Sequence, residues 1–480
     1  MPVIILADRV PRAFVRLFSK TTAVTLASIT RPNDWTADSW RERTALQQPE
    51  YPDQQAFERV IDELKDYPPL VTQWEVERLK SFLAEASAGK RFVLQGGDCA
   101  ERFDECNTQV VTNRLKIMLQ MSLILLYGMR KPIVRVGRFA GQFAKPRSSL
   151  YETRGGVTLP SYRGDIINRT GFSPEERIPD PRRMLQAYTV SALSLNYVRA
   201  LSEGGFADLH HPENWSVDFM RSSPLARDYR QLLESIDEAI RFMETVAGGA
   251  IDELDRVSFF TSHEALHLPY EQALTRSVPT SDRVYNLSTH FPWIGMRTAQ
   301  LDGAHVEYAR GISNPLAIKV GPTMSRTWLR DLINTLNPGD EPGRLTLITR
   351  LGADQIGSRL PEIIDGVRAT GKRVLWICDP MHGNTEQTEN GIKTRRFENI
   401  LSELEQAFEI HHAEGTYLGG VHFEMTGEDV TECTGGARGL KEADLTRAYR
   451  SHVDPRLNYE QALEMAFSIA RKYKAMRRQA

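Results

Sequence analysis

The sequence has few cysteines and no long hydrophobic run. Its 480 residues contain four cysteines, and no two of them have CxxC spacing. This scarcity argues against a disulfide framework and a zinc ribbon, and it is typical of a protein in a reducing compartment. No run reaches the roughly 18 apolar residues of a membrane span, so we expect no membrane partner.

The chain also lacks a large excess of charge of either sign. Its formal net charge is -2, whereas a nucleic-acid partner usually requires a basic face, so we expect no such partner. Any anion site must therefore come from individually placed Arg and Lys side chains. Hydrophobic content of 41% and charged content of 25% are those of a globular protein.

Residues 1–33 differ from the rest of the chain. They are rich in Ser and Thr and carry a net charge of +4, from five basic residues and one acid: Arg9, Arg12, Arg16, Lys20, Arg31 and Asp8. Three interpretations stay open: a transit peptide, a poorly ordered extension, or a start codon placed too early. We expect a cytoplasmic protein, with a plastid location as the alternative if the segment is a transit peptide.

Eight short apolar segments look like buried strands, and helical patterns separate most of them. The strands are predicted at 91–97, 132–137, 256–261, 283–289, 316–321, 345–350, 373–378 and 420–424. Helices are predicted at 54–65 and 73–88, in a helical segment 34–90, and then at 107–128, 299–311, 325–336, 354–370 and 391–413. This alternation predicts a (β/α)8 TIM barrel over 91–480. A doubly wound sheet is the alternative, but no GxGxxG or P-loop pattern supports it.

The connection between the second and third predicted strands is unusually long, at roughly 120 residues. It contains helical patterns at 182–203 and 225–247, so we predict a helical insertion at about 152–256. Such an insertion can mediate oligomerisation or carry an effector site, and added bulk is the simplest alternative.

Ionisable residues follow the predicted strands, at the barrel end where (β/α)8 enzymes keep their active sites. Cys99, His382 and Glu424 are metal-ligand types from three strands, and a mixed sulfur, nitrogen and oxygen set suits a divalent ion such as Mn, Co, Fe or Zn. A histidine in a loop is alone more often a capping residue, so the prediction rests on the coincidence of all strand ends.

Cationic residues form the second group at these strand ends: Arg138, Lys145, Arg297, Lys319 and Arg350. Several such residues at one mouth imply a substrate with more than one anionic group, because Arg pairs bidentately with phosphate and carboxylate. The residues thus predict a metal-dependent barrel enzyme with phosphorylated acidic substrates, and they leave the reaction open.

Six long motifs resemble the signatures of type II 3-deoxy-D-arabino-heptulosonate 7-phosphate (DAHP) synthases, over about residues 35–470. These motifs are Phe92–Glu101 (FVLQGGDCAE), Gly141–Ser148 (GQFAKPRS), Leu159–Asp165 (LPSYRGD), Gln300–His305 (QLDGAH), Asp379–Thr385 (DPMHGNT) and Asp454–Asn458 (DPRLN). The resemblance implies a (β/α)8 barrel that condenses phosphoenolpyruvate with erythrose 4-phosphate and releases phosphate, the first step of the shikimate pathway.

The resemblance also implies roles for individual residues. The metal ligands would be Cys99, His382, Glu424 and Asp454, with Mn or Co expected and Zn, Fe or Cd as alternatives. The phosphoenolpyruvate site falls on Arg138, Arg297, Lys319 and Arg350, and the erythrose 4-phosphate site on Lys145, Ser148 and Arg297. Arg138, Lys319, Arg350 and Glu264 are the expected catalytic residues, with Glu264 or His382 moving protons. The long form of the family further implies inhibition by aromatic amino acids and a homodimer or homotetramer.

One departure from the family pattern concerns the segment before Gln300. Relatives carry Gly-Glu-Arg-Thr-Arg there, whereas this chain has Gly295-Met296-Arg297-Thr298-Ala299. Either activity survives because Arg297 and the ligands remain, or the substrate pocket has changed. Two other functions are the alternatives: a related metal-dependent condensation on another phosphorylated sugar, and a degenerate barrel that binds aromatic amino acids and regulates a partner.

Overall fold

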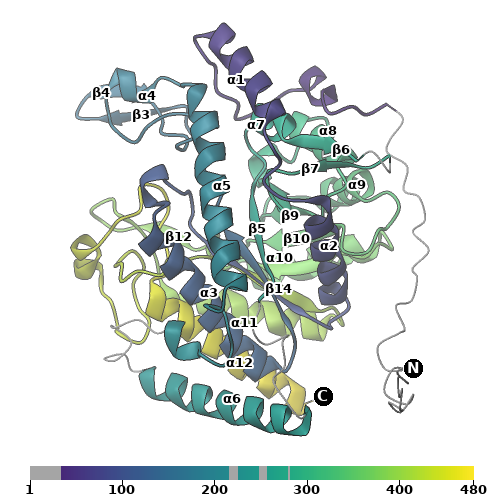
Figure 1. The fold of residues 1–480 in the computed structure, drawn as a ribbon, viewed down its shortest axis with the longest axis vertical. Helices are drawn as coiled ribbons and strands as arrows, with labels where there is room; N and C mark the ends of the chain where they lie inside the picture. The colour runs from purple at the N-terminus through teal and green to yellow at the C-terminus, as the bar shows by residue number, and fades with distance from the viewer. Residues whose placement is uncertain (1–33, 216–224, 248–256, 279–281, 480) are drawn as a thin grey trace, which may run out of the picture.

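Eight parallel strands form a closed barrel in the computed structural model, which describes residues 34–215, 225–247, 257–278 and 282–479 (Figure 1). In chain order they are β1 (Phe92–Gly97), β2 (Ile133–Arg138), β5 (Phe259–Glu264), β8 (Phe291–Ile294), β9 (Leu316–Val320), β10 (Leu345–Thr349), β11 (Leu375–Cys378) and β14 (Leu418–Glu424). The barrel closes through pairing of β1 with β14, so the predicted (β/α)8 fold is confirmed.

Helices cover the outside of the barrel. They are α3 (Thr108–Met129), α8 (Ala304–Gly311), α9 (Arg326–Leu336), α10 (Ile356–Arg368), α11 (Phe397–Ala413) and α12 (Tyr459–Gln479). Most predicted helices are found within a few residues, but 299–303 is a connection and 391–396 contains strand β13 (Lys393–Arg395), paired with β12 (Thr385–Gln387). Helix α12 was not predicted.

The amino-terminal end of the barrel is sealed by helix α2 (Gln73–Ser87), which follows α1 (Gln54–Asp66). A capping box starts α2, because Thr72 and Glu75 exchange hydrogen bonds between side chains and backbone. Its apolar face, with Leu79, Leu83 and Ala86, packs into one cluster with side chains from the barrel strands. The open end of the barrel is therefore the carboxyl end of the strands.

Two strand predictions were wrong in position. Residues Val284–Asn286 form β7, which pairs antiparallel with β6 (Thr275–Ser277), and the fourth barrel strand is β8 at Phe291–Ile294. The third barrel strand, β5, extends to Glu264, three residues beyond the predicted end. Polar residues at 262–264 suggested a loop, but they are buried inside the barrel wall.

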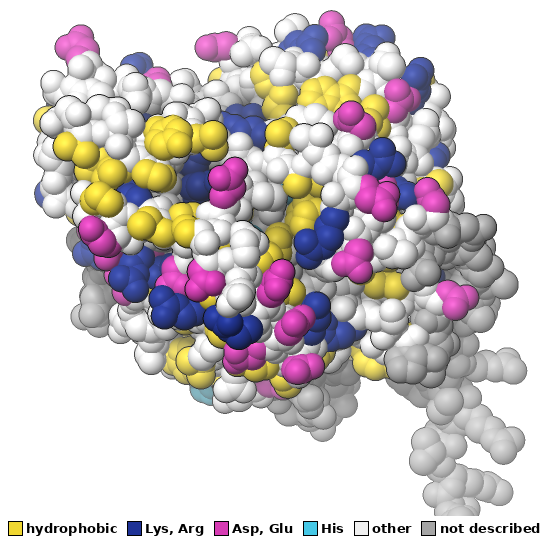
Figure 2. Space-filling model, turned by 90° about the horizontal axis from the view of Figure 1, so that it is seen from above, with side chains coloured by type: hydrophobic (Ala, Val, Ile, Leu, Met, Phe, Trp, Pro, Cys, Tyr) yellow, Lys and Arg dark blue, Asp and Glu magenta, His cyan; other side chains and the backbone are white. Residues whose placement is uncertain are grey.

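The long connection between β2 and β5 contains a hairpin and helices: β3 (Tyr151–Arg154), β4 (Val157–Pro160), α4 (Pro174–Arg177), α5 (Arg182–Glu203) and α6 (Ala226–Ala247). Figure 1 shows the hairpin at the upper left and α6 below α3 and α12. Exposed hydrophobic residues occur on and beside the hairpin, namely Leu150, Tyr151, Val157 and Ile178. Figure 2 shows hydrophobic side chains gathered on that side of the molecule. The predicted extension 1–33 lies outside the described residues.

Helix α3 is the central helix of the outer layer, and α12 packs along it. It is long and apolar enough to cross a membrane, but 67% of its most apolar window is buried inside the protein, as in a core helix. Gly128 of α3 lies directly against α12, because a Cβ atom at this position would be 2.3 Å from Ala470 Cβ. The close packing of the two helices thus depends on a residue without a side chain.

Gly128→Ala is therefore expected to destabilise the protein by about 1–3 kcal/mol, since overpacking outweighs the better helix propensity of Ala. Chemical denaturation measures this loss. Gly357→Ala is the matched control, because the nearest atom to its Cβ would be 3.6 Å away, in Gln406. The control should be neutral or more stable, and equal effects of both changes would contradict the packing argument.

Candidate active site

The strand register places the first site residues at the same height in the barrel. Gly97 at the end of β1 pairs with Arg138 of β2 on one side and with Glu424 of β14 on the other. A Cβ atom on Gly97 would lie 2.8 Å from the carbonyl oxygen of Arg138, so only glycine fits this close approach. A cation and an acid thus face each other across the first strand.

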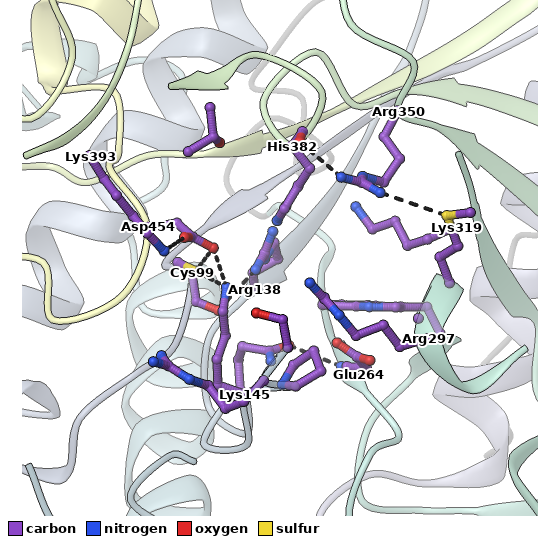
Figure 3. A pocket seen from close by; sticks show the side chains of 18 residues that line it. Cys99, Arg138, Lys145, Glu264, Arg297, Lys319, Arg350, His382, Lys393 and Asp454 are labelled. Carbon is purple, nitrogen blue, oxygen red and sulfur yellow. Dashed lines mark hydrogen bonds and ion pairs between the residues drawn. The ribbon is translucent and has the colours of Figure 1, made fainter. Parts of the chain in front are cut away.

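The carboxyl ends of the strands surround a cavity of about 260 Å³ (Figure 3). Ten of the eleven predicted site residues line it: Cys99, Arg138, Lys145, Ser148, Glu264, Arg297, Lys319, Arg350, His382 and, from the loop before α12, Asp454. The eleventh, Glu424, is fully buried and contacts His382 and Arg138.

The four predicted metal ligands converge. Donor atoms of Cys99, Glu424 and Asp454 all lie within 4.8 Å of one another. His382 Nε2 is 2.9 Å from Glu424 Oε1. Sulfur and carboxylate oxygen thus lie together, with the His382 nitrogen beside Glu424, and this donor chemistry suits a borderline divalent cation.

A cation of the protein already lies among these donors. The Lys145 ammonium is 2.6 Å from Cys99 Sγ and 2.5 Å from Asp454 Oδ2. Burial raises the pKa of the Cys99 thiol, and the nearby Glu424 carboxylate raises it further. Burial alone would raise the pKa of Asp454 too, but Lys145 and other cations hold it well below its usual range. The donor atoms thus favour a positive charge among them, and a divalent metal ion fits this requirement.

Arg395, which sequence reasoning missed, ties the ligand-bearing segments together. It is fully buried, and its guanidinium is 2.8 Å from Glu424 Oε2. It also donates to the Pro455 carbonyl, next to Asp454, and to Thr385 Oγ1 at 2.9 Å, in the loop of His382. No local pattern marks it, because it lies in the β12–β13 hairpin rather than at a strand end of the barrel.

Arg138 and Lys319 lie deep in the cavity on either side of Trp293. The Arg138 guanidinium is 5.2 Å and the Lys319 ammonium 5.8 Å from the centre of the Trp293 rings, both in range of a cation–π interaction. Burial lowers the pKa of Lys319 to about 8, although Asp379 opposes this effect. Trp293 was missed as a site residue because the fourth strand was placed too early.

Arg350 directly follows β10 and points into the cavity with Arg297 (Figure 3). Its guanidinium donates to the His382 carbonyl at 2.9 Å and lies 3.8 Å from Met296 Sδ. Met296 also packs over Gly321, where a Cβ atom would be 2.3 Å from the sulfur. The position of the missing family acid is therefore filled by an apolar side chain beside Arg350.

Glu264 is an acid among these cations, and its Oε1 is buried and accepts no described hydrogen bond. Its backbone N–H is held by the Gln142 side chain at 2.9 Å. Burial raises the pKa of Glu264, even though Lys145, Lys319 and Arg297 act in the opposite direction. A carboxyl group with a raised pKa holds a proton more readily than an exposed carboxylate does, and it can deliver that proton to a substrate in the cavity.

A closed (β/α)8 barrel with metal donors and several cations at its mouth defines a metal-dependent enzyme that acts on anionic substrates. Comparison with known proteins identifies which one. Residues 35–470 match the model described as the Class-II DAHP synthetase family. The chain belongs to this family of metal-dependent enzymes, and it is a 3-deoxy-7-phosphoheptulonate synthase of the first step of the shikimate pathway.

Individual relatives agree with the family match. A phospho-2-dehydro-3-deoxyheptonate aldolase of Neurospora crassa is 48% identical in an alignment 468 residues long that covers 94% of this chain and 97% of the relative. The protein of the same name in Streptomyces coelicolor is 48% identical, covering 91% and 97%. One from Mycolicibacterium smegmatis is 44% identical, covering 90% and 93%.

Met296→Glu is expected to change kcat/KM by less than about tenfold, because Arg297, Arg350 and the metal donors form the site without an acid at 296. Steady-state kinetics with both substrates measure this. Met296→Leu, which keeps the apolar contact with Arg350, is the control and should match the native enzyme. A much larger rise in activity for Met296→Glu alone would show that the native site is impaired.

Proposed function

We propose that the protein condenses phosphoenolpyruvate with erythrose 4-phosphate in the cavity at the mouth of the barrel (Figure 3). The observation that carries this proposal is the convergence of four metal donors and five cations on one cavity of about 260 Å³. The two substrates together carry two phosphates and a carboxylate, which this excess of cations can neutralise.

Cys99, His382, Glu424 and Asp454 are proposed to hold the metal, with Mn or Co as the expected ion. When bound, the metal supplies a Lewis acid that polarises the aldehyde oxygen of erythrose 4-phosphate. A bound divalent ion would repel the Lys145 ammonium from Cys99 and Asp454. It is then available to the erythrose 4-phosphate phosphate, together with Ser148 and Arg297.

Arg138, Lys319, Arg350 and Arg297 are proposed to bind phosphoenolpyruvate. Arg138 and Lys319 are buried at 2% and 6% exposure, so their charges act in a low-dielectric environment, where they hold an anion more strongly. The enol carbon of phosphoenolpyruvate attacks the aldehyde carbon, water adds at the carbon that bears the phosphate, and phosphate leaves. Fixed cations stabilise the charge that develops on these oxygens.

Glu264 is proposed to deliver the proton that the aldehyde oxygen takes up as the carbon–carbon bond forms. Support comes from its unpartnered Oε1, its position in the cavity wall and the direction of its pKa shift. His382 is the second candidate, but its ring nitrogens face Asp379 and Glu424.

His382→Ala is expected to lower the affinity for a divalent ion more than about 100-fold and to abolish turnover. Losing a hydrogen-bond partner of a metal ligand costs up to about 100-fold in metal affinity, and losing the ligand itself should cost more. Isothermal titration with Mn²⁺ and phosphate-release assays measure the two effects. Circular dichroism should show a folded barrel, because His382 is partly exposed. Normal turnover of this variant would refute the assignment.

Regulation by aromatic amino acids is a further part of the proposal. A second cavity, of about 620 Å³, lies where α2 and α5 meet the first half of β5. Leu195, Val198 and Phe260 give it an apolar wall, and Glu75 and Arg199 provide opposite charges for an ammonium and a carboxylate. Ser202 Oγ is buried there with no described hydrogen-bond partner.

Filling this cavity with Ser202→Phe is expected to abolish inhibition by Phe, Tyr and Trp, given singly and mixed, while basal kcat/KM stays within about twofold. Initial rates with and without each amino acid measure this. Ser235→Phe, on the outer helix α6, is the control and should keep the inhibition. If the native rate does not respond to any of the amino acids, the regulatory part of the proposal fails.

The oligomeric state and the location stay predictions. Exposed Leu150, Tyr151 and Val157 on the β3–β4 hairpin support the expected homodimer or homotetramer, because large exposed apolar groups are typical of interfaces. The cytoplasmic location, with a plastid as the alternative, depends on residues 1–33.

A further inference from the structure

One buried carboxylate oxygen connects the metal donors with the cations of the substrate site. Asp379 follows β11 and is fully buried. Its Oδ2 is 2.7 Å from His382 Nδ1 and also accepts a hydrogen bond from the Lys319 ammonium. His382 is a proposed metal ligand and Lys319 a proposed phosphoenolpyruvate ligand, so a single oxygen touches both sites.

The contacts of Asp379 fix the chemical state of His382. Asp379 Oδ1 accepts the backbone N–H groups of Met381 and His382 at 3.0 and 3.3 Å, which holds the carboxylate in place. A carboxylate only accepts, so Nδ1 of His382 must carry the proton. Nε2 is therefore the ring nitrogen left for a metal; it faces the Glu424 carboxylate at 2.9 Å, and a proton shared with that carboxylate would have to leave when the ion binds.

We propose that Asp379 couples the two sites, so that metal and phosphoenolpyruvate each strengthen the binding of the other. This inference rests on the proposed function. A cation on Nε2 withdraws electrons from the imidazole and makes Nδ1–H a stronger donor to Asp379. Asp379 then holds Lys319 less strongly, and the ammonium can turn its hydrogen bonds toward a substrate anion.

The reverse direction follows from the same contacts. When a substrate anion engages Lys319, the negative charge of Asp379 acts on His382 alone. A stronger carboxylate partner makes the imidazole a better metal ligand. By thermodynamic linkage the two effects must be equal in size, so the coupling is one factor measured from either side.

Other connections between the sites set the design of the experiment. Arg350 donates to the His382 carbonyl at 2.9 Å, so a residue proposed to bind phosphoenolpyruvate also touches the backbone of a metal donor. Arg138 is 3.2 Å from Glu424 Oε1, so it also links an anion-binding residue to a donor. Glu403, another fully buried carboxylate, accepts from Leu351 N at 2.8 Å and from Asn384 Nδ2 at 2.7 Å. Glu403 thus joins the loops of Arg350 and His382 without contacting Lys319, and it serves as the matched control.

The test measures Co²⁺ affinity of the metal-stripped protein by titration, with and without saturating phosphoenolpyruvate and with no erythrose 4-phosphate present. Absorption from the Cys99 thiolate reports the bound ion. Phosphoenolpyruvate should raise the native affinity for Co²⁺ at least about fivefold, and Co²⁺ should raise that for phosphoenolpyruvate equally. In Asp379→Asn, the increase in affinity that each ligand causes for the other should fall below about twofold. In Glu403→Gln this mutual increase should stay as large as in the native protein.

Each of the other possible outcomes contradicts the proposed coupling or the proposed function. If native protein binds both ligands with no mutual effect, the coupling is refuted without any variant. An unchanged factor in folded Asp379→Asn assigns the coupling to Arg138, to Arg350 or to direct contact between the ligands, and overturns the proposal. Equal losses in Glu403→Gln and Asp379→Asn would assign it to loop order instead. If neither ligand binds native protein, the proposed function itself fails.

Discussion

The site depends on the compensation of charges that the barrel buries at its carboxyl end. Glu424 is completely inaccessible to solvent, and Arg138, Arg395 and His382 surround its two oxygens. Removing one partner of a buried pair costs several kcal/mol, because the remaining charge has no water to stabilise it. The donors therefore hold their positions through the cations around them, and the same arrangement draws in a metal and anionic substrates.

A second layer of buried ion pairs holds the loops that carry the site. Asp98, next to Cys99, is bound between Arg114 and Arg456, and Arg456 also reaches Glu432 at 2.8 Å. These contacts connect the end of β1 to the loop of Asp454. Glu101 accepts three backbone N–H groups from residues 140–142, at the start of the loop that carries Lys145. Such support keeps reacting groups in place before substrate arrives.

The sequence predicted the barrel and most of its strands, because a strand buried on both faces is a short apolar run that needs no distant information. The prediction from sequence was wrong for two segments that do not follow this rule. Residues 262–264 are polar but belong to β5, since the inside of the barrel end is lined by functional groups. Residues 284–286 lie in a segment that resembles a barrel strand, but they form a hairpin with β6, because tertiary structure decides which strands pair.

What the sequence by itself determined is local: the caps and apolar faces of the helices, the strands, and the turn at Asp379 that presents His382. The tertiary structure alone decided which of these groups meet. Asp454 and Arg395 lie far along the chain from Cys99, and no spacing rule joins them. Their convergence, the position of Lys145 among the donors and the double contact of Asp379 follow from strand register and loop packing, which act between residues distant in sequence.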